Sequence, residues 1–293
     1  MEHPARLTVG VVGAGRVGAV LGAALARAGH RVTGAYAVSD ASRARAADLL
    51  PGVPLADVAT VVAGAELVLL AVPDDALAHL VSGLSAIGAW QAGQMAVHTS
   101  GRHGVAVLRP AREHHVLPLA LHPAMTFTGT AMDLDRLADC PFGVTTDDEL
   151  RPIAEALVME MGGEPVWVAE DARVAYHAAL AHGANHLVTL TSEAMELLSR
   201  AGVAEPRRVV GPLMRAALDN ALRLGDAALT GPVARGDVGT VEDHLRELDR
   251  LSPQIRRTYV ALARATALRA LDSGRLRPAA ALPLLDILAD QEH

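Results

Sequence analysis

Short apolar runs alternate with helical patterns through the first half of the chain. Each run has the length of a strand and is followed by glycine or polar residues. Continuous apolar strands are typical of a parallel sheet that helices cover on both faces. The pattern therefore predicts an α/β domain with a doubly wound, mainly parallel sheet. The predicted strands are Leu7–Val12, Arg31–Val38, Glu66–Val72, Gln94–His98 and His115–Leu121, with Phe142–Thr145 and Pro165–Val168 as late edge strands.

The pattern changes after about residue 168. Asp171–Arg200 contains no proline and a single glycine, which predicts one long helix. This segment is apolar over most of its circumference, as expected of a buried central helix. Only helical patterns follow it. We therefore expect an α/β domain over residues 1–168, an all-α domain over residues 169–293, and a cleft between them.

The first predicted strand runs into Gly13-Ala14-Gly15-Arg16-Val17-Gly18, a GxGxxG pattern. A helix that ends at Gly29 and a second strand follow, so the glycines lie in a β–α–β unit. There Gly13 permits a tight turn, Gly15 lets the backbone approach a phosphate, and Gly18 lets helix and strand pack closely. The helix N-terminus offers free N–H groups to a pyrophosphate. We therefore expect a Rossmann-type dinucleotide-binding domain in which all six residues contact the cofactor.

The residues after the second strand bear on which dinucleotide binds. NAD sites usually have an acidic residue at the end of this strand, but here Val38 closes it. Ser39, Ser42 and Arg43 follow and suit the 2′-phosphate of NADP, whereas Asp40 would repel a phosphate if it pointed inward. These residues favour NADP(H), with NAD(H) as the alternative. Ser39 or Asp40 could instead only cap the next helix.

Composition narrows the classes of function. The net charge of −7, without an Arg-rich run, argues against nucleic-acid binding. All 26 basic residues are arginine, which excludes a catalytic lysine, and the single Cys140 excludes an intrachain disulfide or a cysteine zinc site. No apolar run reaches the roughly 20 residues needed to span a membrane. Because Met1–Leu7 also lacks a signal-peptide pattern, we expect a cytoplasmic protein without a membrane partner.

Polar residues follow three predicted strands, where open α/β sheets bind ligands. Val72-Pro73-Asp74 is expected at the cofactor, and His98-Thr99-Ser100-Gly101 and His122-Pro123 near its nicotinamide. Thr99 is an expected substrate contact. Ser100 could bond a substrate carbonyl or the cofactor carboxamide, or only form a turn. His122 is a candidate acid–base group because imidazole titrates near neutral pH, the alternative being a histidine that only bonds the backbone.

The long predicted helix carries polar residues on a largely apolar surface. His177 and Asn185 are eight residues apart, a little over two turns, so both could face the cleft as catalytic groups. Tyr176 is an expected substrate contact. His182 and His186 have a four-residue spacing that can bind zinc, but no third ligand is evident and no metal site is expected.

The segment Leu229–Asp237 interrupts the helical region with a Gly-Pro pair and contains Arg235. A planar guanidinium can hold a substrate carboxylate or a cofactor phosphate through two parallel hydrogen bonds. The alternative is an ordinary loop between helices, with Asp237 capping the helix that carries His244.

Together these motifs resemble those of Rossmann-like proteins with a DUF2520 C-terminal domain, over nearly the whole chain. That family is similar to the 6-phosphogluconate dehydrogenase-like superfamily, whose helical domains often build dimers. Relatives include ketopantoate reductases, pyrroline-5-carboxylate reductases, prephenate dehydrogenases and F420-dependent NADP reductases. The motifs are the glycine loop, Val-Pro-Asp-Asp at 72–75, His-Thr-Ser-Gly at 98–101, His-Pro-Ala-Met-Thr-Phe at 122–127, Tyr-His at 176–177 with Asn185, and Thr-Gly-Pro-Val-Ala-Arg-Gly-Asp at 230–237.

The resemblance implies a homodimeric NADP-dependent oxidoreductase that transfers a hydride to a small carboxylate substrate. Its first expected substrate is 2-dehydropantoate, in pantothenate biosynthesis. Imine reduction, F420–NADP exchange and a non-catalytic NADP-binding regulator are the alternatives. Ketopantoate reductases use a lysine four residues before a helix asparagine, but that position before Asn185 is Ala181. The expected proton donor is therefore His122 or His177, while Ser100 and Asn185 orient the substrate and Arg235 binds its carboxylate.

Overall fold

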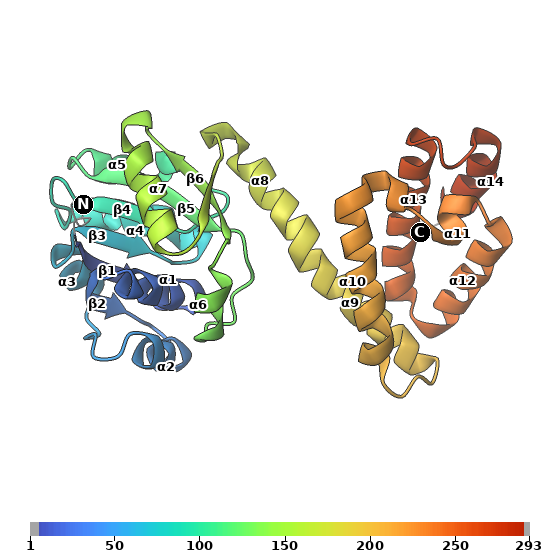
Figure 1. Ribbon diagram of the computed structural model, residues 1–293, viewed down its shortest axis with the longest axis horizontal. Helices are drawn as coiled ribbons and strands as arrows, with labels where there is room; N and C mark the ends of the chain where they lie inside the picture. The colour runs from blue at the N-terminus through green and yellow to red at the C-terminus, as the bar shows by residue number, and fades with distance from the viewer. Residues whose placement is uncertain (1–5, 290–293) are drawn as a thin grey trace. The chain divides into compact units, whose positions relative to one another are not determined.

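The computed structural model describes residues 6–289. Residues 1–5 and 290–293, which include most of the segment examined for a signal peptide, lie outside the described residues. The chain divides into two compact units, residues 1–184 and residues 185–293 (Figure 1), which we call the sheet unit and the helical unit. The boundary expected at residue 168 lies before helix α8 (Arg173–Leu180), which belongs to the sheet unit.

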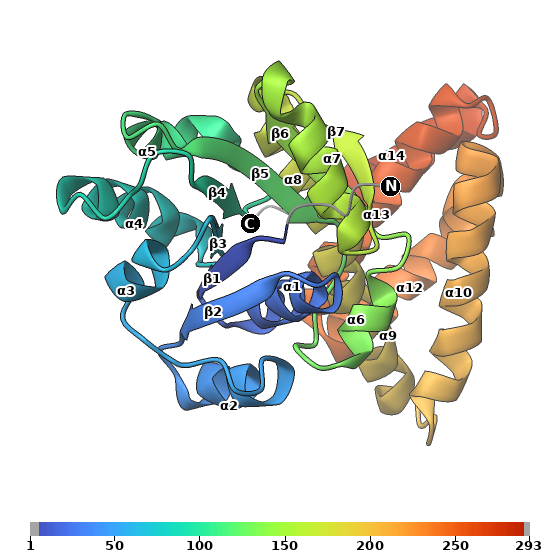
Figure 2. The same ribbon diagram turned by 60° about the vertical axis from the view of Figure 1, so that its left-hand side comes forward.

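A seven-stranded sheet in the order β2-β1-β3-β4-β5-β6-β7 forms the centre of the sheet unit (Figure 2). Neighbouring strands are parallel except β5 and β6, which are antiparallel. The predicted α/β class with a mainly parallel sheet is thus confirmed. The sequence predicts the last two strands as edge strands. Of these two, β6 lies inside the sheet and only β7 is at an edge, opposite β2. The strands are β1 (Thr8–Val12), β2 (Arg31–Tyr36), β3 (Leu67–Leu70), β4 (Met95–His98), β5 (Leu117–Pro123), β6 (Pro141–Thr146) and β7 (Glu164–Trp167).

The side chains of β3 show why these apolar runs form a sheet covered on both faces. Leu67 and Leu69 pack into one apolar cluster with α1 and α7, whereas Val68 and Leu70 pack into a second with α3 and α4. Successive strand residues point to opposite faces, so a strand buried on both sides must be apolar throughout. The other helices of this unit are α1 (Arg16–Arg27), α2 (Asp40–Leu49), α3 (Val58–Ala63), α4 (Asp74–Ala86), α5 (Arg109–Arg112), α6 (Met132–Arg136) and α7 (Arg151–Glu160).

Five strands end one or two residues away from the predicted position, and β2 and β5 show the reasons. Strand β2 stops at Tyr36, because the Tyr36 carbonyl accepts hydrogen bonds from Gly13 N at 3.1 Å and Ala14 N at 2.9 Å. Val38, the expected end of β2, is 70% exposed. Strand β5 continues past Leu121, because His122 pairs with Gly143 of the antiparallel strand β6.

The segment predicted as one long helix consists of α8, a π-helical turn at Ala181–Asn185, and α9 (His186–Arg200). The expected burial is wrong for the single chain, since Arg173 is the only buried residue of α8 and no residue of α9 is buried. A helix that is apolar on several sides must be covered on several sides to be buried. In the helical unit only part of α9 is covered, by α10 and α13, and Val188 stays 63% exposed.

The helical unit contains only helices after α9, as the sequence predicts. Its core lies among α11, α12, α13 and α14 and includes Val241, Leu245, Ala267 and Leu284.

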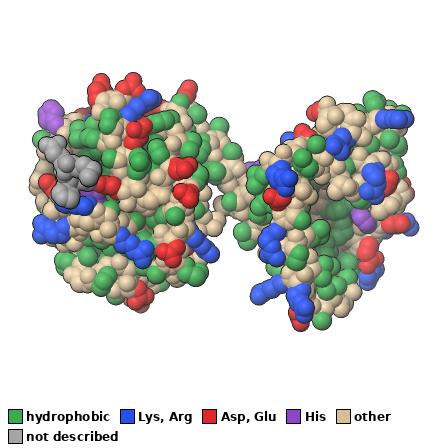
Figure 3. All heavy atoms as spheres, in the orientation of Figure 1, with side chains coloured by type: hydrophobic (Ala, Val, Ile, Leu, Met, Phe, Trp, Pro, Cys, Tyr) green, Lys and Arg blue, Asp and Glu red, His purple; other side chains and the backbone are tan. Residues whose placement is uncertain are grey.

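Among residues 6–289, no helix combines the length and the apolar character that a membrane span requires. Figure 3 shows acidic and basic side chains interspersed over the visible face of each unit. The helices are α10 (Pro206–Leu224), α11 (Gly231–Arg235), α12 (Val238–Leu251), α13 (Pro253–Asp272) and α14 (Pro278–Ala289).

Candidate nucleotide-binding and catalytic site

The glycine loop follows β1, which lies between β2 and β3 at the point where the strand order reverses. Ligands of open α/β sheets bind at this point, outside the carboxyl ends of the strands. Gly13 has φ +98°, and a Cβ there would lie 2.6 Å from Ala71 O. A Cβ on Gly18 would overlap Gly13 O. The fold therefore requires glycine at both positions, for the tight turn and the close packing that the sequence predicts.

Gly15 differs from the other two glycines of the loop. No described atom lies within 4 Å of the position that its Cβ would occupy. It stands at the N-cap of α1, and no side chain caps this helix. The first N–H groups of a helix and its positive dipole end form an anion site when no side chain fills it. The open space at Gly15 and the uncapped helix therefore fit the pyrophosphate of a dinucleotide.

Two arginines come close together near this loop. A Cβ on Gly129 would lie 2.8 Å from Arg45 Nε and 3.0 Å from Arg16 Cγ, so both side chains reach the same segment. Guanidinium groups bind phosphate through planar, paired hydrogen bonds. Arg16 belongs to the predicted loop, but Arg45 on α2 was not singled out by the sequence. Its position one helical turn after Ser42 is the signal that would have found it.

The residues after β2 that were predicted to bind a 2′-phosphate make hydrogen bonds and an ion pair within α2 and its N-cap. Ser42 N donates to Ser39 Oγ at 3.2 Å and Ser39 N donates to Ser42 Oγ at 3.0 Å, which is a reciprocal cap of α2. The capping alternative therefore applies to Ser39. Arg43 is exposed and pairs with Asp40 at 3.5 Å. Binding of a 2′-phosphate by these residues stays a prediction.

The residues after β3 lie against the glycine loop. Val72 Cγ1 is 3.3 Å from the position of a Cβ on Gly13. Pro73 is the N-cap of α4, and Asp74 begins that helix and lies 4.0 Å from Arg102 Nε. Val72, predicted as the last residue of its strand, therefore lies against the loop, and its contact with a bound dinucleotide stays a prediction.

Three predicted site residues come together in the sheet unit. His122 on β5 lies 3.0 Å, Nδ1 to OH, from Tyr176 on α8, and the ring centroids of His122 and His177 are 5.9 Å apart. A Cβ on Gly101 would be 3.0 Å from His122 Nε2 and 2.6 Å from His177 Cδ2. The glycine of the His-Thr-Ser-Gly motif therefore lets both imidazoles approach the loop after β4. We call His122, Tyr176 and His177 the histidine–tyrosine cluster.

The protonation states of this cluster follow from its burial. Burial, His177 and the cation of Arg173 together lower the pKa of His122 to about 4. Burial raises the pKa of Tyr176, so its hydroxyl keeps its proton, and the tautomer of His122 sets the direction of the hydrogen bond between them. In the tautomer that accepts from Tyr176 at Nδ1, the hydrogen of the neutral imidazole lies on Nε2, beside Gly101. The expectation that His122 titrates near neutral pH is wrong, because α8 covers it and adds positive charge.

Arg173 is a residue of the site that the sequence analysis missed. It is fully buried without an ion-pair partner among the described residues, and burial lowers its pKa to about 10. Its guanidinium donates to Thr145 Oγ1 at 2.7 Å, Ala120 O at 2.9 Å, Gly143 O at 3.1 Å and Ser100 O at 3.4 Å. Arg173 thus ties α8 to strands β5 and β6 and to the loop after β4, beside the cluster. The only signal in the sequence is one arginine in an otherwise apolar stretch.

The loop after β4 is held by buried hydrogen bonds. His98 Nδ1 accepts from Ser100 N at 3.2 Å, so Nε2 carries the hydrogen and donates to Gly104 O at 2.8 Å. Burial lowers the pKa of His98 to about 3. Ser100 is 6% exposed, and its hydroxyl accepts from His103 N at 3.2 Å, which is the turn-forming alternative. Contacts of Ser100 and of the half-buried Thr99 with a substrate stay predictions.

The remaining predicted residues belong to the helical unit. Asn185 is exposed at the end of the π turn, so its spacing from His177 is not purely α-helical. Arg235 donates to Asp237 Oδ2 from Nε at 3.0 Å and from an NH2 group at 2.7 Å. In the alternative for this segment Asp237 caps the next helix; Asp237 is at the N-cap position of α12, but its side chain makes this ion pair and no capping bond. Among residues 6–289, no group of three His, Cys, Asp or Glu side chains could hold a metal ion.

The comparisons with known proteins agree with this architecture. Residues 2–123 match the model of a Rossmann-like domain, and residues 140–266 match DUF2520, a domain of unknown function. These matches confirm the resemblance that the motifs indicate and the predicted Rossmann-type domain. No curated protein matches the chain.

Solved structures share the fold at low sequence identity. A protein from Bacteroides fragilis, to which NADP oxidoreductase activity has been ascribed, is 24% identical over 89% of this chain and 98% of that one, with a TM-score of 0.74. An imine reductase from Pseudomonas sp. is 20% identical over 87% and 91% of the two chains, with a TM-score of 0.64. An imine reductase from Myxococcus stipitatus in complex with NADP+ is 19% identical over 98% and 100%, with a TM-score of 0.63.

The free energy of unfolding is expected to fall as the pH decreases from about 6.5 to about 4. His122 has a folded-state pKa of about 4, below its ordinary value of 6.5, so the unfolded chain binds more protons in this range. Protonation of His122 should lower the free energy of unfolding by on the order of 2–3 kcal/mol over this pH range. Urea denaturation across this range should show a smaller loss for His122→Asn, which cannot titrate. Equal losses in both proteins would contradict the depressed pKa of His122.

Proposed function

We propose that this protein is an NADPH-dependent reductase that transfers a hydride to the C=N bond of a small cyclic imine. The open space at Gly15 and the uncapped N-terminus of α1 support binding of a pyrophosphate there. Arg16 and Arg45 support the phosphorylated cofactor, since both reach the same segment beside the loop. When bound, NADPH supplies the hydride. The NADP oxidoreductase activity ascribed to the Bacteroides fragilis protein supports a nicotinamide-dependent enzyme. The two imine reductases of the same fold support imine reduction as its reaction.

We propose C=N rather than C=O as the bond that accepts the hydride because His122 is neutral at pH 7. A carbonyl oxygen needs a proton as the hydride arrives, and a general acid with a pKa near the working pH supplies it best. His122, with a pKa of about 4, is neutral at pH 7, and the chain contains no lysine. An iminium substrate already carries its proton and needs orientation more than acid catalysis. In the tautomer that accepts the Tyr176 O–H at Nδ1, His122 Nε2 presents a hydrogen-bond donor of defined direction.

The test is NADPH oxidation with a panel of cyclic imines and 2-oxo acids, including 2-dehydropantoate. Cyclic imines are expected to be reduced faster than the oxo acids. His122→Asn should lower kcat about 100-fold and Tyr176→Phe about tenfold, because they remove the positioned group and its anchor. His79→Asn, at an exposed histidine of α4, should leave kcat unchanged. Faster reduction of oxo acids would refute the C=N assignment, and binding of NADPH without any turnover would favour a regulator.

Reduction of a 2-oxo acid such as 2-dehydropantoate is the second candidate. The guanidinium of Arg235, 61% exposed, favours it because such a group can hold a carboxylate through two hydrogen bonds. The ion pair with Asp237 at 2.7 Å counts against it, since the substrate would have to displace that carboxylate. Arg235→Met should raise the KM of a 2-oxo acid if this candidate is correct, and leave the KM of a neutral imine unchanged.

We further propose that the helical unit forms a homodimer through α9 and α10. Val188, Leu213 and Leu222 are 63%, 66% and 79% exposed on these helices. Monomeric proteins rarely expose large apolar patches, and a two-fold axis lets one such face cover its copy. Light scattering should give a monomer mass for Leu213→Glu/Leu222→Glu and a dimer mass for the wild type. Leu282→Glu on α14, which is also exposed, should stay dimeric, and a monomeric wild type would contradict the dimer.

A further inference from the structure

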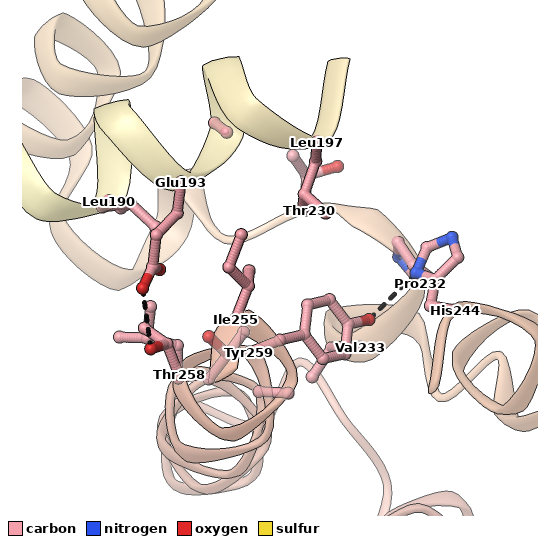
Figure 4. A pocket seen from close by; sticks show the side chains of 14 residues that line it. Leu190, Glu193, Leu197, Thr230, Pro232, Val233, His244, Ile255, Thr258 and Tyr259 are labelled. Atoms are coloured by element: carbon pink, nitrogen blue, oxygen red, sulfur yellow. Dashed lines mark hydrogen bonds between the residues drawn. The ribbon is translucent and has the colours of Figure 1, made fainter. Parts of the chain in front are cut away.

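The helical unit contains a half-open cavity of about 410 Å³ between α9, α11 and α13 (Figure 4). This volume lies in the range of small-molecule sites. Most of its wall is apolar and comes from Leu190 and Leu197 on α9, Val233 on α11, and Ile255 and Leu262 on α13. A ligand with a hydrocarbon body would therefore gain contact area and lose hydration in this cavity.

One carboxylate points into this apolar cavity. Glu193 extends from α9 toward α13, where Thr258 Oγ1 donates to its Oε1 at 3.0 Å (Figure 4). The second oxygen, Oε2, accepts no hydrogen bond from a described residue and is accessible to solvent on the cavity side. Among the residues that line the cavity, all of them described, Glu193 is the only one with a fixed charge at neutral pH. A half-buried carboxylate with a free oxygen is best satisfied by a cationic donor on the ligand.

The aromatic wall of the cavity suits the same ligand. Tyr259 on α13 lines it, and its hydroxyl lies 2.9 Å from His244 Nδ1 at the rim. Burial raises the pKa of Tyr259, so the hydroxyl keeps its proton and shares a hydrogen bond with His244 Nδ1. The polar end of Tyr259 is thus occupied, and its ring remains as an apolar surface for the hydrocarbon body of the ligand.

We infer that this cavity binds a small molecule with a protonated amine on a hydrocarbon body. The amine donates to Glu193 Oε2, and the hydrocarbon body packs against the leucines and Tyr259. A carboxylate ligand would be repelled by Glu193, and a neutral alcohol would leave the charge of that group without a counterion. The site lies entirely within the helical unit and does not depend on nucleotide binding or on the proposed reaction.

The test is calorimetric titration of the full chain with cyclohexylamine, cyclohexanol and cyclohexanecarboxylate at neutral pH. The amine is expected to bind at least about tenfold more tightly than the alcohol, and the carboxylate not measurably. This comparison uses only the wild-type protein, so it does not depend on the folding of a variant. Equal affinity for amine and alcohol, or no binding of any of the three, would overturn the inference; the second result is expected if another protein segment fills the cavity.

Three variants test whether the amine of the ligand binds at Glu193. Glu193→Gln keeps an acceptor for Thr258 and should weaken cyclohexylamine binding about tenfold, removing the preference over cyclohexanol. Glu196→Gln is the matched control, because Glu196 is exposed on the same helix, pairs with Arg200 and does not line the cavity. Ala194→Leu should fill the cavity and abolish binding of both amine and alcohol. Unchanged amine affinity in Glu193→Gln would overturn the inference.

The same variants separate this site from the proposed reaction. Glu193→Gln should bind NADPH as the wild type does, because the glycine loop belongs to the sheet unit. Competition between cyclohexylamine and a cyclic imine that disappears in Glu193→Gln would identify the ligand of this cavity as the organic substrate class, and competition that Glu193→Gln does not change, or none, would identify a separate effector. Either result supports the site. Amine binding that depends on Glu193 in a protein without reductase activity would refute only the proposed function.

Discussion

Replacement of Gly15 by leucine is expected to leave the protein folded and to weaken NADPH binding at least about 100-fold. Residue 15 has φ −74°, a conformation open to any residue, and no described atom would touch the new Cβ. The leucine side chain would occupy the open space beside the N-terminus of α1. Steric exclusion of the pyrophosphate would then remove its bonds to the helix N–H groups. Fluorescence titration with NADPH measures the loss, and circular dichroism checks the fold.

Two other glycines provide the controls for this experiment. Gly83→Ala in the exposed part of α4 also meets no described atom and should bind NADPH normally. Gly18→Leu should instead disrupt the fold, because its Cβ overlaps Gly13 O. Wild-type affinity in folded Gly15→Leu would show that the dinucleotide does not bind at this loop.

Replacement of Arg173 by methionine is expected to lower the free energy of unfolding by about 2–4 kcal/mol. Methionine fills a similar volume but donates no hydrogen bond to the four oxygens that the guanidinium serves. Buried acceptors without donors are costly, and this loss outweighs the relief from burying a cation. Urea denaturation measures the change. The free energy of unfolding of Arg173→Lys should lie between those of the wild type and Arg173→Met, since an ammonium group can donate to some of these oxygens.

The matched control is an arginine on the surface. Arg151 packs over the Trp167 ring at 4.6 Å and pairs with Asp148 at 3.1 Å, and its side chain is 51% exposed. Arg151→Met should change the free energy of unfolding by less than about 1 kcal/mol. Similar denaturation midpoints for Arg173→Met and Arg151→Met would contradict the structural role of Arg173.

Local patterns explain what could be predicted from the sequence. The apolar runs define β1, β3 and β4 within two residues, because a strand buried on both faces leaves a continuous apolar signal. The glycine loop was predictable because its spacing reflects local geometry: Gly13 has φ +98°, and a Cβ on Gly18 would overlap Gly13 O. The histidine–tyrosine cluster could be anticipated only as separate residues, since β5 and α8 are brought together by the fold.

Non-local contacts explain what could not be predicted. Whether β6 is an edge depends on β7 pairing beside it, and β6 carries no local mark of that pairing. The burial of α9 depends on what surrounds it and not on its own composition. The pKa of His122 is set by burial and by charges on α8, more than fifty residues later in the chain. Arg235 and Asp237 were both noticed, but the sequence alone could not decide between a helix cap and an ion pair.

The proposed hydride transfer to C=N can be tested directly with NADPH that carries deuterium at the transferable position of the nicotinamide. The wild type would be incubated with this cofactor and a five-membered cyclic imine, beside Gly15→Leu and His79→Asn, and the amine product analysed by mass spectrometry. The proposed reaction predicts an amine with one deuterium from the wild type and from His79→Asn, and none from Gly15→Leu. An unlabelled product, or no amine from a sample that reduces a 2-oxo acid with the same cofactor, would contradict it.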